Sequence, residues 1–526
     1  MSHAIRTDLA TRARYAQGGG VHRIIPAAVA RPRDSRELDD ALAWAAARGL
    51  PIPARGAGSS MGGGALGEGL VLDLTTFQAT AACQLDAGAH RAVVAPCLSL
   101  GSLDEAARPH GLRLGPDPSS AAWATVGGVI GTNAAGPRSY RAGAMDRWVD
   151  ALTLHTADGP LHLVRGGPAD PGHPVVQRFT RDVLPMLARD QAAIERRWPR
   201  TRKNSLGYGL DRYWRSGDLL DLVIGGEGTL GVVTGATLRL EPVPAHQAGL
   251  RIELASRDLL PHVLEMLEEW QPVAIELLDR SFLGVVDRGD PGVAAMLLVE
   301  FEADDPRALV ARVRSCGDRV ASLAHQVDAA HDRAERAELW AIRHAASPVL
   351  AGIRDGRRSL QVVEDGCVPV AQLARYLDAV ESACREGAVD VVMFGHAGDG
   401  HVHVNLLPDL TLPDWLSRVG AILDRVTEAV IALGGTPAGE HGVGRLRAPL
   451  VERVLGPEAL AAFRAIRQAF DPSGRWNPGV IVPEGHPALS RLKVGDQAAP
   501  LPPGVADALQ RIEEERRWGE SRWDGA

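Results

Sequence analysis

A glycine-rich segment, residues 53–64 (PARGAGSSMGGG), places the strongest constraint on how this chain can fold. Glycine lets a backbone approach an anion closely with its N–H groups pointing inward, so the segment could cradle a pyrophosphate. It does not match the Rossmann fingerprint, because Met61 stands at the third glycine position counted from Gly56, and strand-like residues follow without an intervening helix. Taken alone, the loop could equally be a flexible connection.

Hydrophobic periodicity predicts a mixture of helices and strands in the first half of the chain. Apolar residues recur at helical spacing over residues 38–46, behind a capping box made by Asp34 and Glu37. Residues 71–74 and 92–95 match short buried strands. This half is therefore expected to be α/β or α+β.

A second β-rich region leads to a break in the pattern. Residues 219–224 and 232–240 are predicted as strands, and the two prolines within residues 241–244 interrupt the pattern. Beyond the break, a strand over 294–301 and a helix over 371–386 indicate an α+β unit. Because 526 residues are too many for one hydrophobic core, we place a domain boundary at the break.

Charge and cysteine usage narrow the classes of function. Lys and Arg total 57 against 65 Asp and Glu, and the basic residues are scattered, which argues against nucleic acid as a partner. The charged N-terminus and the strand-sized apolar runs predict a cytoplasmic protein without signal peptide or transmembrane segment. The five cysteines form no ligand set, and Cys384 fits the apolar stripe of a helix, so redox chemistry would need an organic cofactor or a metal with other ligands.

Residues 393–405 (MFGHAGDGHVHVN) concentrate three histidines around a glycine-rich turn. On a strand, His401, His403 and Asn405 share one face, since side chains alternate across a strand. The turn can fold His396 back towards His403. Two imidazoles are an incomplete site, because a divalent ion generally takes a third protein ligand.

A second glycine-rich loop, residues 434–444, offers the missing ligand. It places Glu440 and His441 side by side, where neighbouring side chains point in different directions. Glu440 could complete a metal site while His441 faces a substrate. For each residue alone, an ordinary solvated turn is the alternative, whereas the two motifs together favour a metal site. Such ligands suit zinc, manganese, cobalt and iron alike.

Residues 115–136 and 225–234, together with the loop at 53–64, resemble the FAD-linked oxidases that have a vanillyl-alcohol-oxidase or PCMH-type flavin domain. The resemblance covers about residues 10–484. It implies an α+β fold with a two-part PCMH-type FAD-binding domain and an α+β substrate (cap) domain built on an antiparallel sheet. The expected parts are an N-terminal segment (1–21), the FAD-binding domain (22–244), the substrate domain (245–444), a segment returning to the FAD-binding domain (445–484) and a polar tail (485–526).

The resemblance also implies which residues contact the flavin. These are Arg55, Gly56, Ala57, Gly58, Ser59, Ser60, Met61, Pro116, Ser119, Gly127, Gly128, Asn133, Gly136, Gly228, Val233 and Asn477. Relatives with covalent flavin often use a histidine in the first loop. Positions 55–64 contain none, so FAD is expected to bind non-covalently.

The HxGDGxxHxN and EHG motifs resemble those of the 2-hydroxyacid branch, which includes D-2-hydroxyglutarate dehydrogenase, FAD-dependent D-lactate dehydrogenase and the flavin subunit of glycolate oxidase. The implied roles are metal ligand for His396, His403 and Glu440, base for His441, substrate contact for Asn405, and carboxylate binding for Arg343. The metal would be zinc or manganese. A planar guanidinium suits a carboxylate because it can form two parallel hydrogen bonds.

These roles predict oxidation of a D-2-hydroxy acid, such as lactate, glycolate or 2-hydroxyglutarate, to the 2-keto acid, with metal-assisted hydride transfer to flavin N5. The amino-acid sequence of residues 355–369 most resembles that of proteins in which the flavin unit is fused to an iron–sulfur half. Val363 replaces a lysine of the hydroxyglutarate enzymes, which puts strict hydroxyglutarate specificity in doubt. His401 replaces a more usual Asn and could be an alternative metal ligand or a residue at the rim of the site, of which the rim is favoured.

The sequence does not specify the electron acceptor. A quinone or a separate protein could serve, including an iron–sulfur subunit docked on the tail at 485–526, which could be a short helix or disordered. The chain could also form a homodimer. One rival hypothesis is a flavin-binding subunit for electron transfer or assembly without its own turnover. Another is a metallohydrolase, which the histidine motif alone would suggest.

Overall fold

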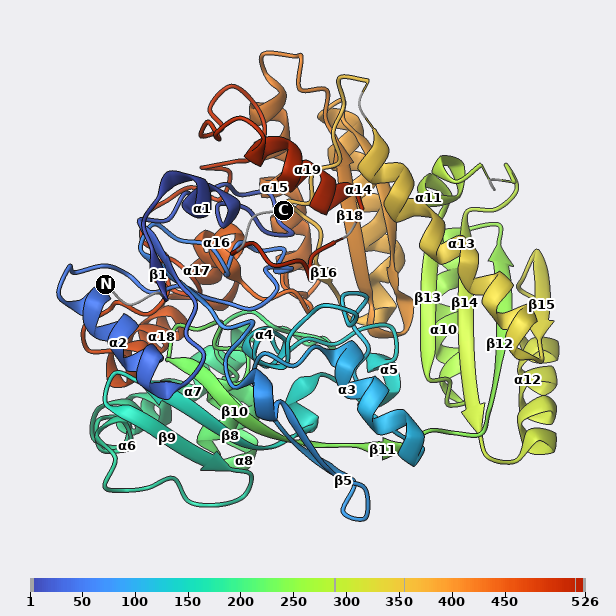
Figure 1. Ribbon diagram of the computed structural model, residues 1–526. Coiled ribbons are helices and arrows are strands. Elements are labelled where there is room, and N and C mark those ends of the chain that lie inside the picture. The colour runs from blue at the N-terminus through green and yellow to red at the C-terminus, as the bar shows by residue number, and fades with distance from the viewer. Residues whose placement is uncertain (1–3, 288–289, 354, 516, 524–526) are drawn as a thin grey trace.

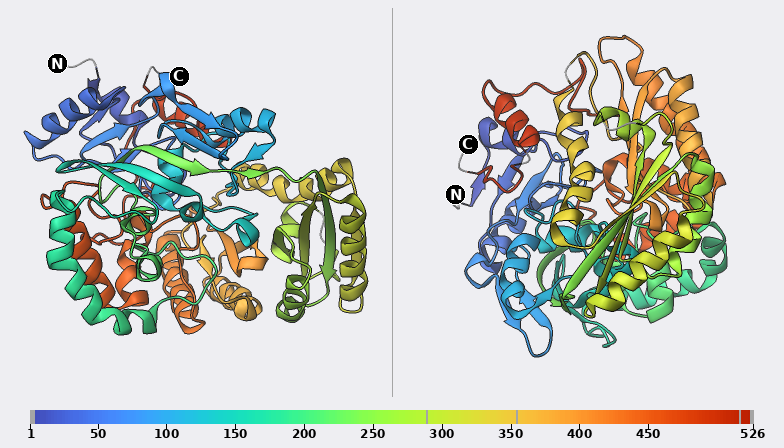
Figure 2. Two further views of the ribbon diagram at one scale, coloured as in Figure 1. Left: turned by 90° about the horizontal axis from the view of Figure 1, so that it is seen from below. Right: turned by 90° about the vertical axis from the view of Figure 1, so that its right-hand side faces the viewer.

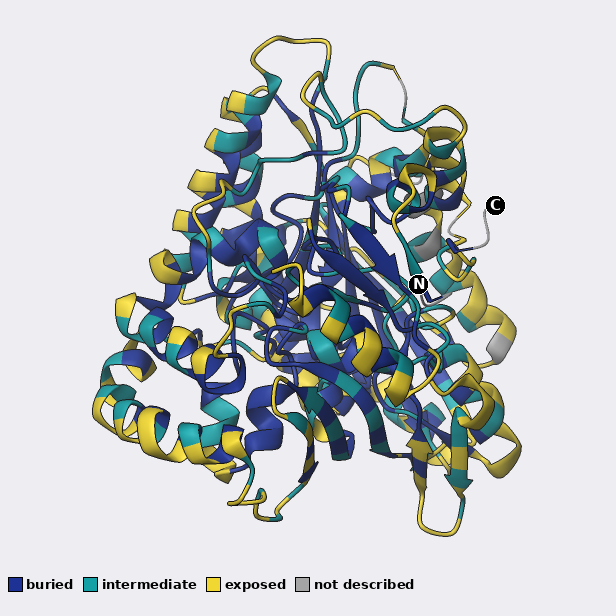
Figure 3. Ribbon diagram, turned by 60° about the vertical axis from the view of Figure 1, so that its left-hand side comes forward, coloured by how far each residue is buried: buried dark blue, intermediate teal, exposed yellow. Residues whose placement is uncertain are grey.

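The computed structural model describes residues 4–287, 290–353, 355–515 and 517–523. Its strands form sheets of four, five and seven strands and one two-stranded ribbon (Figure 1). Strands occupy the buried middle of the molecule, and the outer helices expose one side to solvent (Figure 3). Among the described helices, none has the length and apolar character needed to cross a bilayer.

The four-stranded sheet carries the glycine-rich loop. Its order is β1 (Ile5–Arg6), β2 (Ala28–Ala30), β4 (Leu70–Asp73) and β3 (Ala54–Arg55). The last three are parallel, and α2 (Ser35–Ala46) connects β2 to β3. As predicted, the helix is capped by Asp34, whose side chain accepts a hydrogen bond from the Glu37 N–H. The loop thus leaves the carboxyl end of β3.

The five-stranded sheet is antiparallel throughout. Its order is β5 (Cys83–Asp86), β6 (Arg91–Val94), β10 (Val232–Arg239), β8 (Val149–Thr156) and β9 (Gly159–Val164). The strands expected around 92–95 and 232–240 are therefore confirmed as β6 and β10. Helix α4 (Val126–Thr132) packs its buried residues into the core beneath this sheet.

One predicted strand is wrong, because residues 219–224 contain α9 (Leu219–Val223). Its N-terminus is capped by Asp218, which accepts from the Leu220 N–H at 2.9 Å. All five helical residues are buried. The segment therefore lacks the alternation of a buried and an exposed face that identifies a helix in a sequence. A short, continuous apolar run fits a buried strand and a buried helix equally well.

The seven-stranded antiparallel sheet carries the histidine motif. Its order is β15 (Gln326–Ala330), β12 (His246–Leu254), β14 (Ala295–Ala303), β13 (Ala274–Asp279), β17 (Asp390–His396), β18 (His401–Leu407) and β16 (Gly366–Cys367). One face packs on α10 (Leu260–Glu268), α12 (Pro306–Val320), α14 (Leu373–Glu386) and α15 (Trp415–Ala432). The other packs on α11 (Arg280–Val285) and α13 (Arg333–Gly352), as Figure 2 shows. The predicted strand at 294–301 and helix at 371–386 are confirmed as β14 and α14, and Cys384 lies in the core.

After α15 the chain returns to the first half of the molecule through α16 (Gly444–Arg447), α17 (Val451–Leu455) and α18 (Pro457–Phe470). Residues of α17 and α18 share a hydrophobic core with the five-stranded sheet. The tail then forms α19 (Val505–Glu514), which lies against α1 (Leu9–Arg14) and α13. The tail is therefore a short helix that packs on its own chain.

The exact domain boundaries stay a prediction.

A second glycine stretch, residues 18–20, supports the loop at 53–64, a feature that the sequence reading missed. The Gly19 N–H donates to the Gly58 carbonyl at 2.9 Å, so the two backbones lie in contact. A Cβ atom at Gly20 would collide with the Met61 carbonyl oxygen. Only glycine allows this approach.

We expect Gly20→Ala to destabilise the fold by about 1–3 kcal/mol or more, because the added methyl overpacks against a backbone atom that cannot rotate away. Thermal unfolding measures the effect. Gly235→Ala is the matched control, since a Cβ there meets no atom within 4 Å. Equal melting temperatures for the two variants would contradict the proposed backbone contact.

Candidate active site

One cavity of about 430 Å³ joins the two regions that the sequence singled out. The predicted flavin contacts on its walls are Arg55, Gly56, Ala57, Gly58, Ser59, Ser60, Met61, Ser119, Gly127, Gly128, Gly228 and Val233. The predicted catalytic and metal-binding residues on the same walls are Arg343, His403, Asn405, Glu440 and His441. A molecule bound along the glycine loop would therefore extend to the histidine motif.

Four predicted flavin contacts lie behind the walls instead: Pro116, Asn133, Gly136 and Asn477. Asn133 ends α4 in a left-handed conformation, and its Oδ1 accepts from the Asp146 N–H at 2.8 Å. The Asn477 amide donates to the carbonyls of Gly64 and Glu227 at 2.7 and 2.8 Å. These side chains hold wall segments together, and their direct contact with a flavin stays a prediction.

The side chains and backbone of the cavity walls fit a dinucleotide cofactor with a negatively charged pyrophosphate. The Ser60 hydroxyl is buried and has no hydrogen-bond partner within the described part of the chain. It lies in the glycine loop, and Gly127 and Gly128 at the start of α4 line the same cavity. A buried hydroxyl without a partner is costly, and a phosphate oxygen would supply the missing acceptor.

The register of one hairpin brings two histidines together. In the β17–β18 pair His396 lies opposite His401 and Phe394 opposite His403. The connecting turn, Ala397–Asp399 followed by Gly400 at φ +69°, reverses the chain in the left-handed region that favours glycine. The Nε2 atoms of His396 and His403 come to 3.2 Å from each other, as the sequence pattern suggested.

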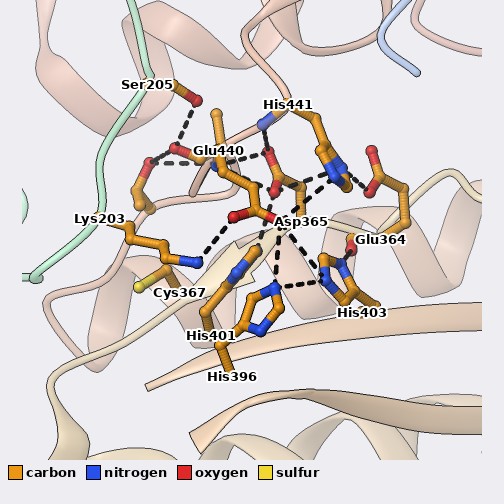
Figure 4. A network of polar contacts seen from close by, with 12 residues as sticks. Lys203, Ser205, Glu364, Asp365, Cys367, His396, His401, His403, Glu440 and His441 are labelled. Carbon is orange, nitrogen blue, oxygen red and sulfur yellow. Dashed lines mark hydrogen bonds and ion pairs between the residues drawn. The ribbon is translucent and has the colours of Figure 1, made fainter. Parts of the chain in front are cut away.

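These two nitrogens lie in one cluster with Glu440 and His401, whose possible ligand atoms are all within 4.8 Å of one another (Figure 4). Glu440 Oε1 lies 3.2 Å from His396 Nε2 and 3.6 Å from His403 Nε2. His396 Nδ1 donates to the Glu276 carboxylate and His403 Nδ1 to the Glu364 carbonyl, so each Nε2 presents a lone pair. Ligands of a tetrahedral zinc ion lie about 3.4 Å apart, so the donor set fits a divalent metal.

Lys203, which the sequence reading missed, holds the other oxygen of Glu440. Its Nζ lies 2.7 Å from Glu440 Oε2 and 3.5 Å from Asp399 Oδ2, and all three side chains are buried. Burial opposes the charge, but the two carboxylates outweigh it and raise the pKa of Lys203. Lys203 therefore stays protonated and turns Oε1 of Glu440 towards the histidines. No motif surrounds Lys203 that could have identified it.

Glu276 is a second residue that the sequence reading missed. It connects His396, a proposed metal ligand, to Arg343, the proposed substrate-binding residue. Its fully buried carboxylate accepts from His396 Nδ1 and, at 2.9 Å, from Arg343 Nε. Burial would raise the pKa of Glu276, but its interactions with His396 and Arg343 lower it, which keeps it ionised. Arg343 also lies 4.5 Å over the Phe394 ring. In the sequence, Glu276 stands between apolar residues of strand Ala274–Asp279, which does not reveal its distant partners.

The His441 ring is oriented by its neighbours. Its Nδ1 donates to Glu364 Oε2 at 2.5 Å, which leaves Nε2 on the side of Glu440, 3.5 Å from Oε1. Burial alone would lower the pKa of His441, but the Glu364 and Asp365 carboxylates raise it to about 10. The carboxylates thus favour the imidazolium form of His441 and would stabilise a proton that Nε2 takes up. Arg447 holds the other oxygen of Glu364.

His401 does not lie at the rim of the site, contrary to the expectation. It is fully buried, and its Nε2 lies 2.9 Å from Asp365 Oδ1. The same carboxylate accepts from the backbone N–H groups of Glu440 and His441 at 3.1 and 3.0 Å. His401 is thus part of the support for the loop that carries Glu440 and His441. Alternation along the strand places His401 and His403 on the same face, but it does not predict which of the two is buried by other parts of the chain.

Asn405 lies on the wall with its carbonyl already used. Its Oδ1 accepts from Gln361 Nε2 at 3.1 Å and from Ser359 Oγ at 3.3 Å, which directs its amide nitrogen away from these two groups. Val363 is buried in the core of the seven-stranded sheet and does not line the cavity. The difference at Val363 therefore does not alter the wall directly.

Comparisons with known proteins agree with the two-part architecture. Residues 26–165 match the FAD binding domain model, and residues 254–481 match the model of the C-terminal domain of FAD linked oxidases. A solved structure of alkyldihydroxyacetonephosphate synthase covers 91% of this chain and 83% of its own with a TM-score of 0.64 and 14% identity. That likeness shows the fold, and the predicted α+β class with a PCMH-type FAD-binding domain is confirmed.

Three relatives show how far the similarity extends. D-lactate dehydrogenase of Archaeoglobus fulgidus is 30% identical over 464 residues, covering 86% of this chain and 91% of that protein. Glycolate oxidase subunit GlcD of Bacillus subtilis is 29% identical over 86% of this chain and 88% of its own length. D-2-hydroxyglutarate dehydrogenase of Pseudomonas putida is 28% identical over 91% of this chain and 50% of its own length.

Proposed function

This chain belongs to the FAD-linked oxidases, and we propose that it is an FAD-dependent dehydrogenase that converts a D-2-hydroxy acid to the 2-keto acid. The observation that carries the proposal is the single cavity, whose walls include both the glycine loop and His441. The names of two relatives, D-lactate dehydrogenase and glycolate oxidase subunit GlcD, support this substrate class.

The cavity residues would divide the work on a hydroxy acid between binding and proton transfer. The Arg343 guanidinium binds the substrate carboxylate, and the Asn405 amide contacts an oxygen of the substrate. His441 takes the proton of the 2-hydroxyl at Nε2, while Glu364 holds its Nδ1 and stabilises the imidazolium that forms. Bound FAD would supply the acceptor for the hydride that leaves C2.

A divalent metal held by His396, His403 and Glu440 would supply a Lewis acid that favours loss of the hydroxyl proton. Zinc and manganese both suit this ligand set. The side chains that orient the ligands, Glu276 and Lys203, keep these three donor atoms directed at one point.

Electrons would leave the reduced flavin through a separate acceptor, either a quinone or a protein. The five cysteines are free and distributed over the two halves of the chain, so they offer no ligand set for an iron–sulfur relay. The alternative of a flavin subunit without turnover is disfavoured, since electron relay alone has no use for an oriented base such as His441.

We expect anaerobic addition of D-lactate, glycolate or D-2-hydroxyglutarate to bleach the flavin absorbance of the purified protein. At least one of these acids should reduce the flavin, and L-lactate should not, because one fixed arrangement of Arg343 and His441 presents only one C2–H to the cofactor. Stopped-flow absorbance measures the rate. A yellow protein that none of a wider panel of D-2-hydroxy acids reduces would contradict the proposed function.

Replacing the base tests its role separately. We expect His441→Ala to bind FAD like the parent and to slow flavin reduction by about 10²–10⁴, the usual contribution of a general base. His110→Ala, at an exposed position outside the cavity, is the matched control. If the His441 variant reduced its flavin at the parental rate, another group would be the base.

Metal content tests the ligand set. We expect elemental analysis of the purified protein to find one divalent ion per chain, and His403→Ala or Glu440→Gln to lose it. His110→Ala should retain the ion. Full activity after complete removal of the ion by a chelator would rule out the proposed Lewis acid.

A further inference from the structure

The C-terminal segment, residues 485–523, contributes to the cavity although it lies beyond the residues matched by the family models. Two of its side chains, Glu513 and Trp518, are among the cavity walls. Helix α19 lies between α1 on the side of the four-stranded sheet and α13 on the side of the seven-stranded sheet (Figures 1 and 2). The segment therefore crosses from one side of the cavity to the other.

One end of the segment is attached to the strand-like stretch that follows the Gly18–Gly20 region. The Arg23 N–H donates to the Arg491 carbonyl, and the Lys493 N–H donates to the Val21 carbonyl, both at 2.8 Å. Leu492 between them is buried. Backbone hydrogen bonds therefore fix this end of the segment to the rest of the chain.

The other end is attached around α1. Trp523 is buried in a cluster with Tyr15, Val29 and Val71. The Arg522 guanidinium is buried and donates to the Gln17 carbonyl at 3.1 Å. This end is therefore fixed by apolar burial and by a charged donor.

The second attachment is connected to the glycine loop through a shared acceptor. The Gln17 carbonyl also accepts from Arg55 NH2 at 2.9 Å, and Arg55 is part of the cavity wall. Burial, together with the charge of Arg55, lowers the pKa of Arg522 to about 9. Two buried guanidinium groups thus meet beside the loop, where an anionic cofactor would relieve their repulsion.

Between the two attachments the segment is packed onto the walls. Leu509 and Ile512 of α19 are buried, and Glu513 pairs with Lys493 at 2.8 Å. A Cβ added at Gly519 would lie 3.6 Å from the Cβ of Trp123, another wall residue. Gly519 therefore lies against Trp123, and the neighbouring Trp518 ring has the Arg522 guanidinium 5.4 Å from its centroid.

We propose that residues 485–523 form a strap that covers the bound cofactor and slows its release. The inference rests on the proposed function only in requiring that FAD occupies the cavity. The first loop offers no histidine for a covalent link, so retention depends on non-covalent contacts. A tryptophan contributes a large apolar area to such a wall, and the two attachments keep it in place without an entropic cost at each binding event.

The test is the rate at which FAD leaves the full-length protein. The holoprotein is diluted into an excess of an apo-flavoprotein that traps free FAD, and the loss of bound flavin is followed by fluorescence. We expect Trp518→Ala and Arg522→Gln to release FAD roughly tenfold faster or more than the parent, because each removes a buried contact of the strap. Trp518→Phe, which keeps an apolar wall, should restore most of the retention.

Two matched controls separate the strap from general destabilisation. Trp44→Ala removes a half-buried tryptophan from α2, and Arg517→Gln removes an exposed arginine from the same tail. Both should release FAD at the parental rate. Equal release rates for Trp518→Ala, Arg522→Gln and the parent would overturn the strap while leaving the proposed function intact. A parent protein that takes up no FAD at all would overturn both.

Discussion

The structure depends on pairing the buried carboxylates that lie around the cavity. Glu276, Glu364, Asp365 and Glu440 are all removed from solvent. Burying an unpaired charge costs several kcal/mol, so each needs a cation or several hydrogen-bond donors nearby. The cations come from distant parts of the chain: Lys203 precedes α8 (Leu210–Ser216), Arg343 lies on α13 and Arg447 on α16. Charge pairing therefore fixes how these segments meet.

The same requirement joins the loop at 434–444 to the glycine-rich loop at 53–64 and to Glu227. The Glu227 carboxylate accepts from the backbone N–H groups of Val443 and Gly444, and the Gly62 carbonyl accepts from the Arg445 N–H at 2.7 Å. A side chain at Gly444 would collide with Gly62, so glycine is needed where the two loops touch. Because His441 is only a few residues away, the proposed base is held beside the proposed flavin site by backbone contacts. A mobile loop could not keep His441 and the flavin site in a fixed arrangement around one substrate.

The sequence predicted the parts of the site that have a local pattern. The alternation of residues 401–405 implied a strand, and the register of β17 and β18 then brings His396 to His403. Glu276 and Lys203 could not be found in this way, because their partners lie 120 and 237 residues away in the chain. The error at α9 has a similar origin, since a fully buried segment carries no periodic contrast. Local signals predicted the ligands, while the charges that orient them are a property of the tertiary structure.

The position of Glu276 has a consequence for how the two halves of the proposed site act together. Its carboxylate accepts from both His396 and Arg343, so a metal ligand and the proposed carboxylate-binding group share one negative charge. An ion on His396 would draw that charge towards the imidazole and leave Arg343 freer to bind an anionic substrate. A substrate carboxylate on Arg343 would, in turn, leave Glu276 to polarise His396 as a stronger ligand. Metal and substrate would then bind with positive coupling, and because linkage is reciprocal, each would raise the affinity for the other by the same factor.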